Sequence, residues 1–339
     1  MESAHRGKRS LEYLQGPAIL AYASVAGKKE GQGPLKNTFD LVSEDTHFGQ
    51  KSWEKAETQM QRHAVELALQ KAGLTERDLD AAFLGDLLNQ CIGSSFSMRN
   101  RNVPTFGLYG ACSTMAESLL LAGMAVDGGY ARRALALTSS HFASSERQYR
   151  FPLGYGGQRT PTAQWTVTGS GAVVLGRSGK GPYLHRATVG VIRDAGIKDA
   201  NNMGAAMAPA AFETIRSHFD DFGIGPEAYD CIVTGDLGKL GSEIVRDLFD
   251  REGVKLGSRY NDCGVLIFDL EKQDVHCGGS GCGCSASVLC GHLLGQMRQG
   301  KLRNLLFCGT GALLSPLSTQ QGESIPAVCH AVSICAERS

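Results

Sequence analysis

Hydrophobic side chains recur along the chain in two patterns. Between residues 53 and 72 they return at helical spacing among charged residues, and Gly73 follows, which predicts a helix that ends at this glycine. Residues 112–127 are predicted to form a second helix. Short unbroken apolar runs predict buried strands at residues 81–84, 134–138 and 172–175.

The second half of the chain repeats the order of the first. Residues 281–308 match residues 110–137 without a gap, from a glycine through small residues and an amphipathic helix to a strand. Alternating strands and helices predict mainly parallel pairing, with helices on the sheet faces. We therefore expect an α/β fold with a duplicated α/β unit in a five-layer αβαβα arrangement. The predicted repeats are residues 1–178 and 179–339, and the active cleft is expected where they meet.

Composition narrows the function classes. The 34 basic and 34 acidic residues give a net charge of zero, with no basic run, so nucleic acid is not an expected partner. No apolar stretch approaches the ~18 residues that span a bilayer, and the first residues lack the apolar core of a signal peptide. We therefore expect a cytoplasmic protein.

The eleven cysteines are predicted to be reduced thiols that act as small core residues. A zinc site is the main alternative, because six cysteines and histidines crowd into residues 276–292. Their spacing lacks paired zinc knuckles, so no metal site is expected. The glycine-rich residues 278–283 lack the lysine of a phosphate-binding loop, so no nucleotide cofactor is expected either.

The most informative motif is Tyr-Gly-Ala-Cys-Ser-Thr at residues 109–114, where a loop leads into a predicted helix. A helix N-terminus presents free N–H groups and a partial positive charge, which would lower the pKa of the Cys112 thiol and bind a carboxylate. Cys112 is thus a candidate nucleophile or ligand contact. The alternative is a small buried residue like the other cysteines.

A duplicated α/β unit with a cysteine at the start of the first central helix resembles the thiolase superfamily. The wider pattern resembles the stage V sporulation protein AD family within it. The segments that carry this resemblance are residues 85–90, 109–114, 138–141, 145–148, 155–158, 167–174, 203–210 and 309–316.

The resemblance implies a thiolase-like fold that binds dipicolinic acid (pyridine-2,6-dicarboxylate) together with calcium and supports its uptake into the developing spore. It further implies a soluble partner of membrane-embedded transport proteins, cytoplasmic in the developing spore and peripherally associated with the inner spore membrane. Thiolase-like proteins commonly pair through a sheet edge, so the resemblance also implies a homodimer.

The chain departs from the thiolase-like enzymes at their supporting catalytic groups. The slot for the catalytic histidine falls at residues 235–237, which contain Asp236, and the slot for the asparagine falls near Cys282 and Cys284. Condensation would therefore lack its base and oxyanion donors, and we expect a protein that is not an enzyme. The alternatives are an acyltransferase or condensing enzyme with Cys112 as nucleophile, and a structural subunit with a vestigial pocket.

Several residues are candidate ligand contacts beside Cys112. Strand and loop ends supply most of them, and the acidic ones would suit a ligand that arrives with calcium. For Asp86 and Asp236, a strong alternative is that the carboxylate caps the next helix. For His141, the alternative is a structural histidine whose hydrogen bonds are made within the protein. The predicted ligand-binding set is Cys112, Asp86, Asn89, His141, Asp194, Asp236, Cys282 and Gly311, with Arg147, Arg150 or Arg159 as a carboxylate clamp.

Overall fold

The computed structural model describes residues 4–149 and 159–338. Its strands are β1 (His5–Arg6), β2 (Ser10–Glu12), β3 (Ala18–Ala26), β4 (Leu41–Val42), β5 (Ala81–Gly85), β6 (Thr105–Gly107), β7 (Arg133–Ser140), β8 (Trp165–Thr166), β9 (Gly169–Gly176), β10 (Tyr183–Thr188), β11 (Cys231–Thr234), β12 (Tyr260–Asp262), β13 (Gly279–Ser280), β14 (Asn304–Ala312) and β15 (Ala327–Cys335). Its α-helices are α1 (Trp53–Ala72), α2 (Ile92–Met98), α3 (Thr114–Asp127), α4 (Phe142–Tyr149), α5 (Met203–Phe222), α6 (Gly238–Arg251), α7 (Cys263–Leu266), α8 (Cys282–Val288), α9 (Leu294–Arg298) and α10 (Pro316–Gln320).

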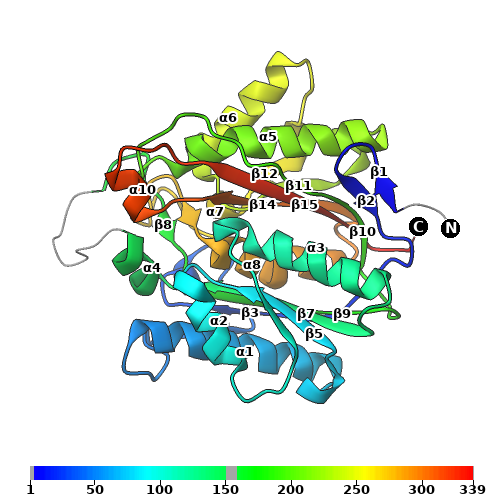
Figure 1. The fold of residues 1–339 in the computed structure, drawn as a ribbon. Helices are drawn as coiled ribbons and strands as arrows, with labels where there is room; N and C mark the ends of the chain where they lie inside the picture. Colours follow the sequence, from blue (N-terminus) through cyan, green and yellow to red (C-terminus); the bar gives the residue numbers. More distant parts are fainter. Residues whose placement is uncertain (1–3, 150–158, 339) are drawn as a thin grey trace.

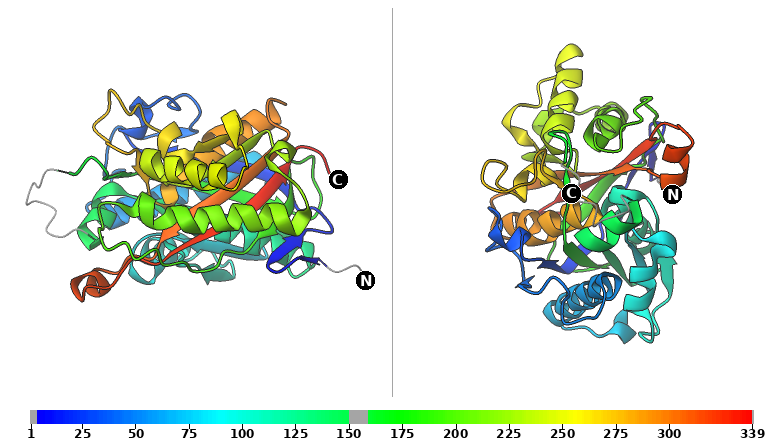
Figure 2. Two further views of the ribbon diagram at one scale, coloured as in Figure 1. Left: turned by 90° about the horizontal axis from the view of Figure 1, so that it is seen from above. Right: turned by 90° about the vertical axis from the view of Figure 1, so that its left-hand side faces the viewer.

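Five layers are stacked in the molecule, as the sequence predicts (Figure 1). Helix α1 covers strands β3 and β9, and α5 covers β14 and β15 at the opposite side. Helices α3 and α8 form the middle layer between the two strand layers, and the end-on view in Figure 2 shows the same stack. The buried core therefore lies on both sides of α3 and α8.

The strand order shows the duplication. One set runs β6-β5-β7-β9-β3 and the other runs β12-β11-β14-β15-β10, and the two sets meet between β3 and β10. The predicted boundary at residue 178 falls in the link between β9 and β10. Strands in equivalent positions of the two sets also come from equivalent positions of the two sequence repeats.

The prediction of mainly parallel pairing is wrong for the centre of the molecule. Parallel pairs occur at the outer strands of each set, such as β5 with β7 and β11 with β14. The inner pairs β7–β9, β9–β3, β14–β15 and β15–β10 are antiparallel. Each repeat ends in a strand that returns along its predecessor without a crossover helix, and an antiparallel partner is the result.

Local signals set the ends of α1 as predicted. The Ser52 hydroxyl accepts a hydrogen bond from the backbone N–H of Lys55 at 3.4 Å, and Gly73 ends the helix in the left-handed conformation with φ of 66°. Gly223 ends the equivalent helix α5 in the same way, with φ of 62°. The matching caps support the correspondence between the two repeats.

The middle layer requires small residues. A Cβ atom on Gly311 of β14 would lie 2.4 Å from the carbonyl oxygen of Gly110, and one on Gly283 of α8 would lie 2.4 Å from that of Gly169. Backbones therefore approach too closely at these points for any larger residue.

Among the described residues, no helix is both long and apolar enough to cross a membrane.

Candidate functional site

Cys112 lies in a tight turn between β6 and α3. Residues Ala111–Ser113 form a short 3₁₀ turn that leads directly into α3 at Thr114. Ala111 adopts a positive φ of 51°, which is unusual for a residue with a side chain and costs of order 1–3 kcal/mol. The surrounding packing holds this strained turn and fixes Cys112, whose side chain is 6% exposed.

Asp236 follows β11 in the second repeat and reaches the same point. Its Oδ1 accepts a hydrogen bond from the Thr310 hydroxyl at 2.8 Å, and its Oδ2 accepts one from the Gly281 N–H at 2.8 Å. The Cys112 thiol also donates to this carboxylate. Burial is the main cause that raises the pKa of Asp236 to about 6, and these hydrogen bonds oppose the rise.

The predicted lowering of the Cys112 thiol pKa is wrong. Burial raises it well above its ordinary value, and the nearby Asp236 carboxylate and Cys282 thiol raise it further. The partial positive charge of a helix N-terminus is a smaller effect than the loss of water around a buried thiolate beside a carboxylate. Cys112 is therefore a protonated thiol at neutral pH.

A small cavity opens beside the Cys112 thiol. Its volume is about 40 Å³, close to the room one water molecule takes, and both repeats contribute to its walls. The lining residues are Leu87, Ala111, Cys112, Ser145, Glu146, Tyr149, Thr166, Met203, Ser280, Ala312 and Leu314. No lysine, arginine or histidine occurs among them, so the described walls are apolar, acidic and hydroxyl-bearing.

Ser145 is distinctive in this cavity. Its side chain is 2% exposed, and its hydroxyl oxygen has no hydrogen-bond partner within the described part of the chain. The neighbouring Glu146 accepts a hydrogen bond from the Thr166 hydroxyl at 3.0 Å. Buried hydroxyls are rarely left without a partner, so Ser145 points to a polar group that the cavity would receive.

Cys282 begins α8, at the position in the second repeat that matches the Cys112 turn. Its thiol donates a hydrogen bond to the Ser139 carbonyl oxygen at 2.9 Å, and the side chain is fully buried. It packs with Cys112 and Leu87 in a small apolar cluster. In the ranges 4–149 and 159–338, no group of three histidine, cysteine or acidic side chains could hold a metal ion.

Asp86 and His141 are engaged in bonds within the protein. The Asp86 carboxylate accepts hydrogen bonds from the Ser94 N–H at 2.7 Å and from the Leu88 N–H at 2.9 Å. His141 lies 2.8 Å from the Thr46 carbonyl oxygen through Nε2, and its Nδ1 accepts from the Ala143 N–H. Neither side chain lines the cavity. Both make the hydrogen bonds expected of a structural role, which is the alternative to ligand binding.

The remaining predicted contacts are spread over the surface and the core. Asn89 lies on an exposed turn, where its N–H donates to the Gln148 side chain at 3.0 Å. Asp194 is exposed and accepts a hydrogen bond from the Ser324 hydroxyl at 2.5 Å. Gly311 lies within β14, and its neighbour Thr310 donates a hydrogen bond from its hydroxyl to Asp236.

The predicted arginine clamp is not formed by the described arginines. Arg147 forms an ion pair with Glu54, and Arg159 forms one with Asp274 at 2.7 Å and stacks on Trp165. Both therefore already have acidic partners outside the cavity. Arg150 lies outside the described residues.

Sequence reasoning missed several residues of the cavity wall, among them Ser145, Glu146, Tyr149 and Ser280. Residues 145–148 carry part of the family resemblance, which was a usable signal. Ser280 directly precedes the turn that is predicted at the position of the catalytic asparagine, so the sequence could also have indicated Ser280. Met203 begins the segment 203–210, which carries the same resemblance, whereas Tyr149 carried no chemical signal in the sequence.

Comparisons with known proteins match almost the whole chain. A family model described as stage V sporulation protein AD matches residues 7–335. Stage V sporulation protein AD of Bacillus subtilis (strain 168) is 46% identical to this chain over 326 residues, which are 96% of each protein.

Similar solved structures show the fold. 3-Oxoacyl-[acyl-carrier-protein] synthase III from Aquifex aeolicus superposes with a TM-score of 0.54 at 15% identity, over 94% of this chain and 100% of that chain. Cerulenin-bound OleA from Xanthomonas campestris superposes with a TM-score of 0.61 at 14% identity, over 96% of this chain and 97% of that chain. The fold is thus thiolase-like, and the chain belongs to the stage V sporulation protein AD family.

Proposed function

We propose that this chain binds dipicolinic acid in the Cys112 cavity and supports its uptake into the developing spore, together with membrane-embedded proteins. A role in sporulation follows from the family. The observation that carries the ligand proposal is the buried, unpartnered hydroxyl of Ser145 in the cavity wall. A carboxylate of the ligand would accept its hydrogen bond.

The polarity of the wall favours a ligand that brings its own cation. Glu146 in the wall and Asp236, which contacts the Cys112 thiol, would repel a bare dicarboxylate, and no basic side chain of the described residues lines the cavity. Calcium binds carboxylate and hydroxyl oxygens, and the planar dicarboxylate would supply the ligands that the wall lacks. The proposed ligand is therefore the calcium complex, with Ser145 and Ser280 as polar contacts.

Entry of the ligand requires movement at the mouth of the cavity. A volume of about 40 Å³ is far below the roughly 300 Å³ and more that is usual for small-molecule sites. Met203 and Leu314 are half-buried and can rotate outward at the smallest cost, whereas rotation of half-buried Tyr149 would break the 2.6 Å hydrogen bond that its hydroxyl donates to the Leu87 carbonyl oxygen. Their apolar surfaces would then cover the flat faces of the pyridine ring.

The same site is poorly equipped for acyl condensation. The Cys112 thiol donates to Asp236 and has a raised pKa, so no thiolate is available near pH 7. The position of the enzymes' catalytic histidine falls at residues 235–237, and that of their asparagine falls near Cys282 and Cys284. Neither place contains a histidine or an asparagine. Acyl transfer on Cys112 is the second candidate function, because the thiol does line a cavity.

Calorimetric titration tests the proposal. The purified full chain is titrated with dipicolinate, with and without calcium, and isophthalate serves as a matched dicarboxylate without the ring nitrogen. Ser145→Ala and Cys112→Ala are compared with Cys231→Ala, a control at the start of β11 outside the cavity. We expect calcium-dependent binding, weakened at least about tenfold by Ser145→Ala and unchanged by Cys231→Ala.

Intact-mass analysis after incubation with acyl-CoA separates the two candidate functions. Absence of an acyl adduct together with saturable dipicolinate binding supports the proposed carrier. A stable adduct that disappears in Cys112→Ala, with no dipicolinate binding, would replace the proposal with acyl transfer.

A further inference from the structure

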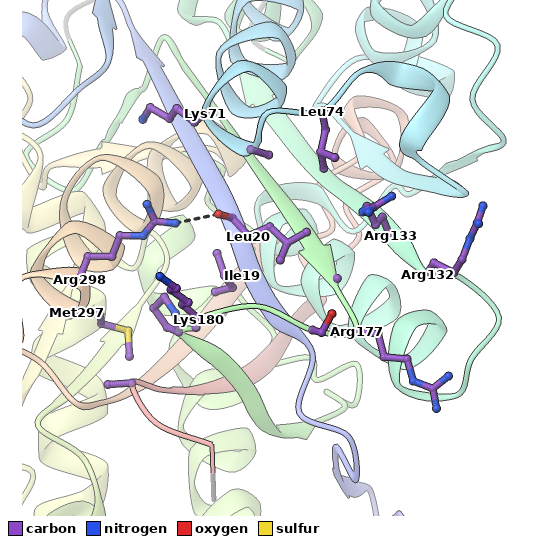
Figure 3. Close-up of a pocket in the computed structure, with 16 residues that line it drawn as sticks. Ile19, Leu20, Lys71, Leu74, Arg132, Arg133, Arg177, Lys180, Met297 and Arg298 are labelled. Carbon is purple, nitrogen blue, oxygen red and sulfur yellow. Dashed lines mark hydrogen bonds between the residues drawn. The ribbon is translucent and has the colours of Figure 1, made fainter.

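A second, larger cavity lies at the opposite end of β7 from the Cys112 site. Its volume is about 850 Å³, and Arg133 at the start of β7 lines it, whereas Ser140 at the other end of that strand adjoins the Cys112 region. Strand β7 would separate the two by roughly 25 Å at ~3.3 Å per residue. Figure 3 shows the residues that line this cavity, here called the basic groove: Ile19, Leu20, Lys71, Ala72, Leu74, Arg132, Arg133, Gly176, Arg177, Ser178, Lys180, Gly181, Pro182, Met297, Arg298 and Ala336.

The groove lies at the seam between the two strand sets. Strands β3 and β10 pair at a single position, Ala18 with Tyr183, so the sheet separates beyond it. The register of β3 against β9 shifts at Leu20, and this bulge turns the strand away from a regular ladder. Gly176 and Gly179 leave space for the Leu20 side chain, because a Cβ on either would lie 2.7 Å from it.

Six basic side chains and no acidic one line the groove. Three of them have acidic partners outside the lining: Lys71 with Asp40 at 2.5 Å, Arg132 with Asp80 at 2.9 Å and Arg133 with Asp78 at 3.8 Å. Arg298 donates to the Leu20 carbonyl oxygen at 3.0 Å and stacks on Tyr22, and it forms no ion pair with a carboxylate of the described residues.

Arg177 and Lys180 complete the set. Both are exposed on the link between β9 and β10, and their side chains form no hydrogen bond or ion pair with any residue that the structure describes. In a chain whose net charge is zero, this gathering leaves a local excess of positive charge. Such an excess attracts an anionic partner and repels a cationic one.

The basic side chains form two groups with an apolar floor between them. In Figure 3, Lys71, Lys180 and Arg298 lie on one side of Ile19 and Leu20, and Arg132, Arg133 and Arg177 lie on the other. A single phosphate or carboxylate could contact one group at a time. An extended ligand with anionic groups at both ends and an apolar middle would contact both groups and the floor.

We propose that the basic groove binds an acidic segment of a partner protein in an extended conformation. Glutamate or aspartate side chains of the segment form ion pairs with Arg177 and Lys180, on opposite sides of the floor, and an apolar side chain between them packs on Leu20. An apolar side chain between acidic ones matches the half-buried Leu20 between the two basic groups, and a uniformly anionic membrane surface offers no such match. This site is separate from the Cys112 cavity and does not depend on dipicolinate binding.

Fluorescence anisotropy with the full-length protein tests this proposal. The probe is a fluorescein-labelled peptide Glu-Glu-Leu-Ile-Glu-Glu, about 20 Å long when extended, and the matched peptide carries glutamine in place of glutamate. The test variant is Arg177→Glu with Lys180→Glu. The control variant is Arg251→Glu with Lys272→Glu, which reverses two side chains that are 73% and 83% exposed outside the groove.

We expect saturable binding of the acidic peptide that weakens with added salt, falls at least about tenfold in the groove variant and persists in the control variant. The glutamine peptide should not bind. Equal losses in both variants would overturn the proposal, because the attraction would then be general. Binding to phosphatidylglycerol vesicles that the groove variant abolishes, with no peptide binding, would assign the groove to a membrane surface instead. Calorimetry of dipicolinate binding on the groove variant separates this test from the Cys112 proposal, since that affinity should not change.

Discussion

The two ends of the strand layers treat charge in opposite ways. At the carboxyl ends of β5, β11 and β12, the acidic groups Asp86, Asp236 and Asp262 are buried, and burial raises the pKa of Asp236 to about 6 and of Asp262 to about 7. At the amino end of β7, basic groups are gathered around a groove that is open to solvent. One end reduces its charge by burial, and the other keeps its charge in contact with water.

This difference indicates two kinds of recognition. A small closed cavity can select a ligand through a few hydrogen bonds, because each unpartnered group inside it is costly. An open charged groove selects by the sign and spacing of charge and is sensitive to salt. The two proposals thus place a small-molecule site and a surface for a macromolecular partner at opposite ends of one strand.

The largest expected effect comes from an added methyl group at the packed end. Gly311→Ala places a Cβ against the Gly110 carbonyl oxygen, which belongs to the rigid Cys112 turn, so we expect a loss of about 3 kcal/mol or more in the free energy of unfolding. Gly176→Ala at the groove end meets only the half-buried Leu20 side chain, which can shift more easily than backbone, so it should cost much less. Thermal unfolding monitored by circular dichroism compares the two, and equal losses would contradict the difference in packing.

The second prediction separates affinity from stability at Ser145. Ser145→Ala removes a buried hydroxyl without a partner, so the free energy of unfolding should stay the same or rise, while dipicolinate affinity falls about tenfold. Calorimetry and thermal unfolding on the same sample measure both. A loss of stability with unchanged affinity would show that the hydroxyl has a structural partner and no ligand.

The sequence predicts most of the architecture through local signals. Helix α1 with its Gly73 cap, the strands at residues 81–84 and 172–175 and the duplicated order all depend on neighbouring residues, and each is confirmed. The strand directions at the centre could not be predicted in this way. Apolar runs such as those of β9 and β15 carry no information on whether a neighbour is parallel.

The electrostatics of the site depend on residues far apart in the sequence. The thiol pKa of Cys112 is set by burial and by Asp236 and Cys282, which come from the second repeat. The basic groove likewise collects Lys71, Arg177 and Arg298 from segments that show no basic run. The neutral composition therefore gave no sign of the charged surface that forms on folding. The motif around Cys112 indicated where the Cys112 site lies but not the protonation state of its thiol.

The third prediction uses pH to test whether the charge of Asp236 affects dipicolinate binding. Asp236 ionises as pH rises through about 6, so we expect the weaker dipicolinate binding that remains without calcium to fall about fivefold further between pH 5 and pH 7. Asp236→Asn carries no charge at either pH and should flatten this profile. Asp262 and the Cys112 thiol face the same carboxylate, so Cys112→Ala is measured alongside, and it should keep the pH dependence.

The pH dependence of stability provides an independent check on the direction of the Asp236 pKa shift. The pKa of folded Asp236 is above its ordinary value, so its favourable contribution is complete below pH 3.8 and is lost as pH rises through about 6. The free energy of unfolding of Asp236→Asn relative to wild type should therefore increase from pH 5 to pH 7.5. A constant difference across this range would show that Asp236 does not titrate there.

The smallest expected effect is at the groove end. Arg177→Ala with Lys180→Ala removes two exposed side chains that have no partner among the described residues, so the free energy of unfolding should change by less than about 0.5 kcal/mol. Relief of like-charge repulsion should make the change slightly favourable at low salt and negligible at high salt, because exposed charges are screened. Urea unfolding at two salt concentrations measures this. A loss above about 1 kcal/mol would mean that the two cations hold the β9–β10 link in place, and they would then serve the fold rather than a partner.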